Sequence, residues 1–257
     1  MKGFISAFRT LTSLPVPGKE ADDFFASLPW FPAVGLILGL ILYGISYGWT
    51  RLPFEQWPAG CSLFMVAAGI WLTGGLHLDG LADWADSLGG FHDREKRLAI
   101  MKDVRLGTFG GLALIIFVLA KWLALERLVF SGSTFLIPPI FACSRAMLVE
   151  LITTLPYARA DEGMAGAFIL GASGRHRLFS HALCLLVCLP FGPVGLVLLG
   201  MSWLMAWLFK IKCRSRFGGI TGDLLGTANE IIEVILLILC ALAGKHILCY
   251  TGPCGMW

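Results

Sequence analysis

The sequence predicts an all-α, polytopic membrane protein, and three observations carry that prediction. Hydrophobic residues make up 57% of the 257 residues and charged residues only 14%, with a mean hydropathy of +0.77. Soluble domains carry about 25% charged residues. Several apolar segments approach the ~20 residues that a spanning helix needs. Lysine and arginine gather in alternate connections between these segments. The chain is therefore expected to be one integral membrane domain over residues 1–257.

The apolar segments set the number of helices. Seven can be drawn, at residues 33–50, 60–78, 109–128, 135–153, 179–190, 193–209 and 228–249. The fifth is short, and two prolines with a glycine, in residues 190–193, separate it from the sixth. That pair could instead form a broken or re-entrant hairpin. We expect about seven transmembrane helices, and six or eight also fit the pattern.

The distribution of positive charge predicts the orientation. If the N-terminus is cytoplasmic, that side carries 15 lysines and arginines and the opposite side 3. Positive residues concentrate on the cytoplasmic side of membrane proteins. The expected location is the cell inner membrane, with cytoplasmic regions that include residues 1–32, 76–108 and 210–230 and the connection that carries Arg159, Arg175 and Arg177. The first thirty residues lack the apolar core of a cleavable signal, and residues 4–14 are expected to form an amphipathic helix at the membrane surface.

Three aspartates follow the second apolar segment, in the run GGLHLDGLADWADSLGG at 74–90. Asp79, Asp83 and Asp86 have helical offsets of 0, 4 and 7, which place them within about 60° of one another on one face. Three like charges on one face repel, and a divalent cation would compensate them. Oxygen ligands suit Mg²⁺. The run predicts a Mg²⁺ site in a cytoplasmic loop.

A second oxygen-rich stripe opens the last apolar segment, in GGITGDLLGTANEIIE at 218–233. Asp223, Thr227 and Glu230 repeat the same helical spacing. Glycines in this run let a backbone or a phosphate approach closely. The alternative is an ordinary helix cap around Asp223. Candidate substrate-binding residues here are Gly219, Thr221 and Gly222.

Basic residues lie near both stripes. A helix that Asp93 can cap ends with Lys102, Asp103 and Arg105. These three charged residues lie at the mouth of the third segment. The alternative role for Lys102 and Arg105, and for Arg94, Lys96 and Arg97 earlier in the same helix, is positive-inside anchoring. Arg145 lies near the middle of the fourth segment, where it must find an anionic substrate, a carbonyl or an ion pair with Glu150 or Glu230. Lys121 either snorkels to the far surface or serves the site.

The histidines and cysteines suggest no further site. His77 points about 160° away from Asp79, which favours a structural hydrogen bond or packing over metal ligation. The eight cysteines include no CxxC pair and are expected to be small buried hydrophobic residues. A net charge of +3 without a long basic run gives no indication of a nucleic-acid partner.

Aspartates on two helix ends, a Mg²⁺ ion between them and basic residues around the rim suit phosphoryl or nucleotidyl transfer. DGLADWAD is loosely similar to the aspartate motif of CDP-alcohol phosphotransferases, although the spacing differs and the Ala-Arg pair is missing. A secondary transporter is the more distant alternative. Its charged residues would cluster at the midplane rather than at one face.

Five segments together resemble the cobalamin synthases, the adenosylcobinamide-GDP ribazoletransferases. They are PVP at 15–17, WFPAVGLILG at 30–39, GGLHLDGLADWADSLGG at 74–90, MKDVRLGTFGGLAL at 101–114 and GGITGDLLGTANE at 218–230. The resemblance covers about residues 4–233. The tail at 241–257 carries no family motif.

The resemblance implies a Mg²⁺-dependent membrane enzyme that joins α-ribazole, or its 5′-phosphate, to adenosylcobinamide-GDP. GMP leaves, and adenosylcobalamin or its 5′-phosphate forms in a late step of cobalamin biosynthesis. Membrane lipid is the other expected partner, and both self-association and association with other corrinoid-assembly enzymes are left open.

The resemblance also implies roles for the candidate residues. The implied metal ligands are Asp79, Asp83, Asp86 and Asp223, and one of the first three would take the hydroxyl proton. Asp103 would be a further ligand or the ion-pair partner of Arg105. The residues implied to hold the diphosphate and the leaving GMP are Lys102, Arg105 and Arg145.

Overall fold

The computed structural model describes the chain except residues 1, 54, 91–92, 160–163 and 245–257. The described residues form helices and one isolated parallel bridge, between Tyr157 and Ile220. In chain order the elements are α1 (Lys2–Leu11), η1 (Phe24–Trp30), α2 (Phe31–Trp49), α3 (Pro58–Thr73), α4 (Leu76–Ser87), α5 (Arg94–Ile100), α6 (Thr108–Ser131), η2 (Thr134–Leu136), α7 (Ile137–Thr154), α8 (Met164–Leu170), α9 (Gly174–Cys188), η3 (Leu189–Phe191), α10 (Gly192–Phe217) and α11 (Gly222–Ala243).

The described residues contain five helical stretches long and apolar enough to cross a membrane, or six if α3 and α4 count as one bent span. This confirms the all-α polytopic fold. The fifth and sixth predicted segments fall in one of these stretches, Gly174–Phe217, which is why fewer than seven are found. Gly192 breaks it with a φ of 55°. α9 has 15 residues and α10 has 26, so α10 alone reaches the ~20 residues of a span.

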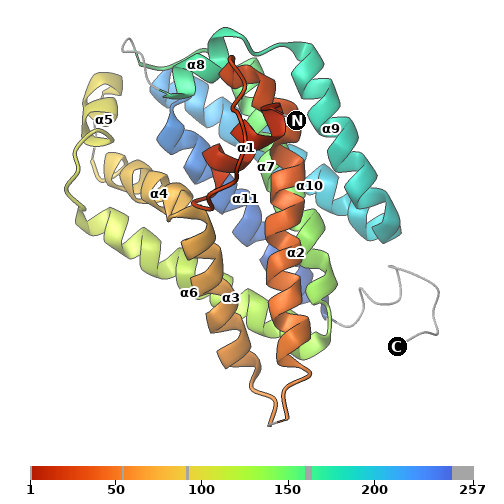
Figure 1. Ribbon diagram of the computed structural model, residues 1–257. Helices are drawn as coiled ribbons and strands as arrows, with labels where there is room; N and C mark the ends of the chain where they lie inside the picture. The colour runs from red at the N-terminus through yellow and green to blue at the C-terminus, as the bar shows by residue number, and fades with distance from the viewer. Residues whose placement is uncertain (1, 54, 91–92, 160–163, 245–257) are drawn as a thin grey trace.

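Two glycines produce the bend between α3 and α4. Gly74 and Gly75 have φ values of 60° and 71°, in the left-handed region that glycine enters without steric cost. The two helix axes differ by 90°. Figure 1 shows α4 turning away from α3 towards α5. The bend separates the helix that carries the three aspartates from the apolar helix before it.

α7 is the central helix. In its candidate span 94% of the residues are buried, compared with 17% for α6. α2 packs closely on it, because a Cβ at Gly35 would lie 2.3 Å from the Phe141 carbonyl oxygen and one at Gly39 would lie 2.5 Å from the Pro138 Cα. This pair of glycines therefore permits close helix packing.

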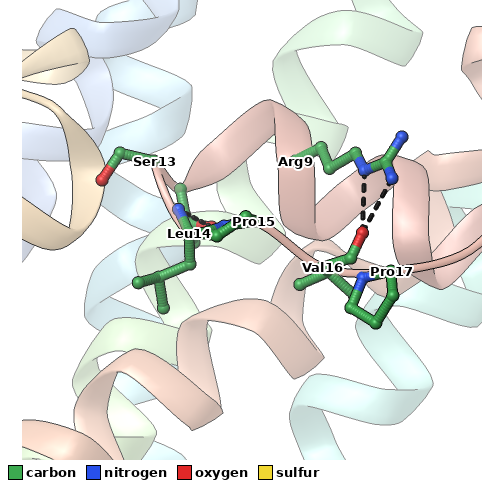
Figure 2. Close-up of a pocket in the computed structure, with 7 residues that line it drawn as sticks. Arg9, Ser13, Leu14, Pro15, Val16 and Pro17 are labelled. Carbon is green, nitrogen blue, oxygen red and sulfur yellow. Dashed lines mark hydrogen bonds between the residues drawn. The ribbon is translucent and has the colours of Figure 1, made fainter.

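The amphipathic helix expected near the N-terminus is α1, and it buries Ala7, Phe8 and Leu11 while packing against η1 and α2. The segment after it lines an open groove with Arg9, whose guanidinium donates to the Val16 carbonyl oxygen at 2.7 Å (Figure 2). The Ser13 hydroxyl donates to the Trp71 carbonyl oxygen at 2.6 Å. The N-terminal segment is thereby tied to the end of α3, next to the bend.

Candidate active site

The site begins where α4 crosses the first turn of α11. A Cβ at Gly80 would lie 2.5 Å from the carbonyl oxygen of Asp223, so only glycine allows this approach. The Thr227 hydroxyl donates to the Gly80 carbonyl oxygen at 2.9 Å. One turn further along, a Cβ at Gly226 would lie 3.1 Å from the His77 Cα. Glycine on both helices therefore brings the two predicted carboxylate stripes together.

Three carboxylates gather at this crossing. Asp83 interacts electrostatically with Asp79, Asp223 and Asp86, and with the opposite charge of Arg159. Asp79 is exposed, and Asp83 and Asp223 are half-buried. In the described part of the chain neither Asp79 nor Asp83 forms a salt bridge. The cluster therefore holds more negative charge than the one guanidinium beside it neutralises.

Arg159 is a site residue that sequence reasoning treated only as one of the cytoplasmic positive charges. Its Nη2 donates to Asp223 Oδ2 at 2.7 Å and to the Met101 carbonyl oxygen at 3.4 Å. Main-chain bonds hold the strand-like segment before it beside α11, with Ala158 N donating to Ile220 O and Ile220 N to Pro156 O, each at 2.9 Å. Nothing in the one-dimensional pattern indicated this pairing across 64 residues.

Gly219 and Thr221 of the GGITGD run at 218–223 have local structural roles. A Cβ at Gly219 would lie 2.2 Å from the Pro156 carbonyl oxygen, so this glycine lets two backbone segments pair. Thr221 is buried and caps α11, its side chain accepting from Leu224 N at 3.2 Å. The cap considered as an alternative is therefore present. Gly222 is exposed, and among the described residues a Cβ built on it would meet only the Ala165 Cβ, at 4.0 Å.

Asp86 occupies a different environment from Asp79 and Asp83. Its two carboxylate oxygens accept hydrogen bonds from Gly107 N and Gly110 N, each at 2.8 Å. Gly107 is the N-cap of α6 and Gly110 lies in its first turn. Both oxygens of Asp86 therefore have backbone donors.

The basic loop before α6 combines an ion pair with an exposed lysine. Arg105 Nη2 lies 2.6 Å from Asp103 Oδ2, and this guanidinium lowers the pKa of the Asp103 carboxyl to about 2. The ion pair considered for Asp103 is thus present. Lys102 is exposed. Two basic residues expected as anchors instead bind the backbone, Arg97 donating to Ser87 O at 2.6 Å and Arg94 to Ala158 O at 3.0 Å.

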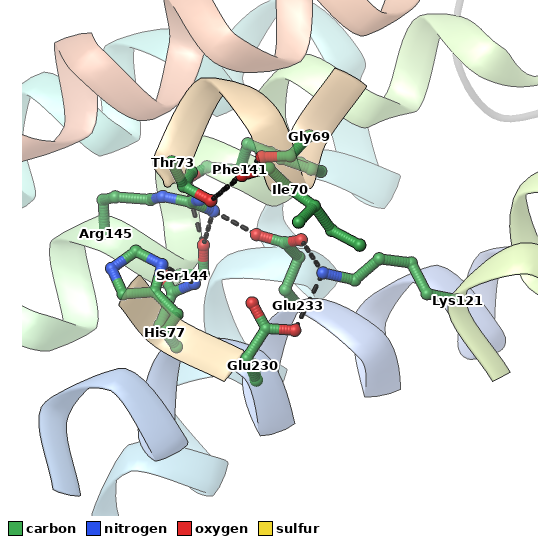
Figure 3. A network of polar contacts seen from close by, with 11 residues as sticks. Gly69, Ile70, Thr73, His77, Lys121, Phe141, Ser144, Arg145, Glu230 and Glu233 are labelled. Carbon is green, nitrogen blue, oxygen red and sulfur yellow. Dashed lines mark hydrogen bonds and ion pairs between the residues drawn. The ribbon is translucent and has the colours of Figure 1, made fainter. Parts of the chain in front are cut away.

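Arg145 does not lie in the exposed loop with Lys102 and Arg105. It is 1% exposed and pairs with Glu233, which corrects the ion pair predicted with Glu150 or Glu230 (Figure 3). Glu233 lies almost one turn beyond Glu230 and reaches both α6 and α7. Glu150 instead lies 3.1 Å from His181 Nε2.

Lys121 completes this buried network. Its Nζ lies 2.8 Å from Glu230 Oε2 and 2.7 Å from Glu233 Oε1, so it does not snorkel (Figure 3). The stripe predicted over Asp223, Thr227 and Glu230 therefore divides, since only its first member faces the carboxylate cluster. We define the four charged residues Lys121, Arg145, Glu230 and Glu233 as the buried charge network.

Known proteins of one family are similar to this chain over nearly its whole length. The family model described as cobalamin-5-phosphate synthase matches residues 3–241. The chain belongs to this family. Family relatives named adenosylcobinamide-GDP ribazoletransferase include one from Chlorobium phaeovibrioides, 40% identical over 95% of this chain and 98% of the relative, and one from Chlorobaculum tepidum, 39% identical over 94% and 96%.

A more distant cobalamin synthase relative, from Syntrophobacter fumaroxidans, carries the same name and is 36% identical over 91% of this chain and 95% of its own length. No solved structure matches the chain. The family assignment confirms the resemblance found in the sequence, and it makes the protein a transferase of cobalamin synthesis.

Two minor expectations for this cobalamin synthase are also settled. His77 Nδ1 lies 3.0 Å from Asn229 Nδ2, and both residues are buried, which confirms the structural role expected for the histidine. Six cysteines are buried and free in the described residues, and three of them cluster. Cys143 Sγ lies 3.5 Å from that of Cys188 and 3.7 Å from that of Cys184, which are distances between thiols in contact rather than disulfides.

Proposed function

We propose that the chain is a Mg²⁺-dependent adenosylcobinamide-GDP ribazoletransferase of the cell inner membrane, with its active site on the cytoplasmic side. It joins α-ribazole or α-ribazole 5′-phosphate to adenosylcobinamide-GDP and releases GMP. The observation that carries the proposal is the crossing of α4 and α11, where Asp79, Asp83 and Asp223 gather beside Arg159. The surplus of positive residues near this end of the bundle supports the cytoplasmic side.

The residues present fit a magnesium ion. The donors at the crossing are carboxylate oxygens, which Mg²⁺ prefers and thiophilic metals do not. The three aspartates carry more negative charge than the one paired arginine can neutralise, so the cluster needs a cation. We assign Asp79, Asp83 and Asp223 as the residues that would hold it. When bound, Mg²⁺ would neutralise the diphosphate and stabilise the charge that develops on it.

The remaining polar groups have roles in binding and proton transfer. Lys102 and Arg105 extend from the exposed loop before α6 and would bind the diphosphate and the departing GMP. Arg159 is beside Asp223 and would pair with a phosphate oxygen in addition to the cations of this loop. Asp79 or Asp83 accepts the proton of the attacking ribose hydroxyl, because neither is committed to a salt bridge in the described residues.

The test is turnover by the purified protein in detergent with adenosylcobinamide-GDP, α-ribazole and Mg²⁺. The Asp83→Asn variant should lose transfer while inserting and folding normally. The matched control is Asp22→Asn, at an exposed carboxylate whose one ion-pair partner among the described residues is Lys2. Wild-type turnover by Asp83→Asn would remove the metal-site proposal. CMP release from a CDP-alcohol would favour the phosphotransferase alternative instead.

A further inference from the structure

We infer that Asp86 is a positioning residue, which caps α6 from the neighbouring helix α4, and is not a fourth aspartate ligand of the magnesium ion beside Asp79, Asp83 and Asp223. The role is distinct from those of Asp79 and Asp83 although all three aspartates share one sequence motif. Both Asp86 oxygens accept from backbone amides, those of Gly107 and Gly110, at 2.8 Å each.

The first turn of α6 has need of such a partner. The first four amides of a helix have no acceptor within the helix. The N-cap of α6 is Gly107, which has no side chain to supply one. Asp86 accepts from the N-cap amide and from one in the first turn, and its negative charge lies at the positive end of the helix dipole. One carboxylate from a separate helix thus replaces a local cap.

Two glycines of the RLGTFGG run make the approach possible. A Cβ at Gly107 would lie 2.3 Å from Asp86 Oδ1, and a Cβ at Gly110 would lie 2.4 Å from Asp86 Oδ2 and 2.9 Å from the Ala82 carbonyl oxygen. A Cβ at Gly111, by contrast, would meet only a Leu106 side-chain carbon among the residues that the structure describes, at 4.0 Å. The first two glycines therefore form a cradle around the carboxylate, and the third does not.

The cap has a consequence for the active site. The loop that carries Lys102 and Arg105 runs directly into Gly107, while Asp86 follows Asp83 by three residues on α4. The two hydrogen bonds therefore fix where the cations of this loop lie relative to the carboxylate cluster. This consequence rests on the proposed function, whereas the cap itself does not.

The cap is tested by hydrogen exchange of the peptide covering residues 106–112, measured by mass spectrometry on the full chain in detergent. In Asp86→Asn one amide of the pair faces an NH₂ group, so exchange in this peptide should accelerate about tenfold or more, as expected for an unsatisfied donor. Gly110→Ala should do the same by displacing the carboxylate. Gly111→Ala is the matched control and should exchange as the wild type does.

Metal binding separates the cap from ligation. We would titrate the purified proteins with Mn²⁺ as a paramagnetic substitute for Mg²⁺ and measure the dissociation constant. The Mn²⁺ dissociation constant of Asp86→Asn should stay within about twofold of wild type, while its KM for adenosylcobinamide-GDP rises. Asp83→Asn should weaken Mn²⁺ binding by at least the 10–100-fold that is typical when a residue hydrogen-bonded to a metal ligand is lost. Unchanged exchange in Asp86→Asn, or Mn²⁺ binding weakened as in Asp83→Asn, would overturn the inference. If Asp83→Asn binds Mn²⁺ normally, the proposed function fails, and the exchange result still decides the cap.

Discussion

The buried charge network allows a prediction worked from its geometry. Lys121 and Arg145 balance Glu230 and Glu233, and all four side chains are at most 14% exposed. Lys121→Met keeps a side chain of similar length and removes its positive charge. Glu230 then loses its only salt-bridge partner in the described residues, while Glu233 retains Arg145.

The expected cost follows from leaving a buried charge without a partner, which is about 3–5 kcal/mol. A change of 1 kcal/mol shifts Tm by about 2–4 °C in a chain of 150–250 residues, so Lys121→Met should lower Tm by about 6–20 °C. Glu230→Gln should cost less, because Lys121 retains Glu233. The double variant Lys121→Met/Glu230→Gln removes one charge of each sign and should recover part of the loss.

The assay is thermal unfolding of the purified variants in one detergent, followed by tryptophan fluorescence. The matched control is Lys2→Met, which removes an exposed lysine that also pairs with a carboxylate. Exposed pairs contribute about 0–1 kcal/mol, so this control should shift Tm by a few degrees at most. A Lys121→Met variant as stable as the control, or a double variant less stable than both single variants, would refute the reasoning.

Three further predictions concern the active site. Gly80→Ala should lower kcat/KM about tenfold or more by pushing α4 off the Asp223 backbone, because its Cβ would lie 2.5 Å from the Asp223 carbonyl oxygen. Gly44→Ala is the control and should keep wild-type turnover, because no described residue comes within 4 Å of a Cβ at that position. Arg159→Gln should raise the KM for adenosylcobinamide-GDP more than it lowers kcat, since it removes the charge beside Asp223 that we propose binds a phosphate oxygen. An unchanged KM in steady-state assays would contradict this. Zn²⁺ in place of Mg²⁺ should support little GMP release, and equal turnover with both metals would count against a site of carboxylate oxygens.

Sequence reasoning predicted what depends on composition and helical period. The apolar fraction and the long hydrophobic segments indicated the polytopic fold, and the offsets of Asp79, Asp83 and Asp86 indicated a shared helix face. The glycines of the run at 218–233 indicated close approach, and a Cβ at Gly219 would lie 2.2 Å from the Pro156 carbonyl oxygen. These features are local, so one sequence is enough to read them.

The features that sequence reasoning missed depend on contacts between distant helices. The pairing of Arg159 with Asp223 follows from the short backbone bridge at Tyr157 and Ile220, which leaves no periodic signal. Glu233 rather than Glu150 pairs with Arg145, because the packing of α11 between α6 and α7 decides which carboxylate comes within reach. A buried charge predicts that a partner exists, but helix packing selects it.

The most direct test of the central claim is nucleotide release by the purified protein with adenosylcobinamide-GDP, α-ribazole and Mg²⁺. The proposed site predicts one GMP for each corrinoid product formed, dependence on Mg²⁺, and loss of both products in Asp83→Asn but not in Asp22→Asn. GMP release that continues unchanged after Mg²⁺ is chelated, or in Asp83→Asn, would contradict a magnesium site built by α4 and α11.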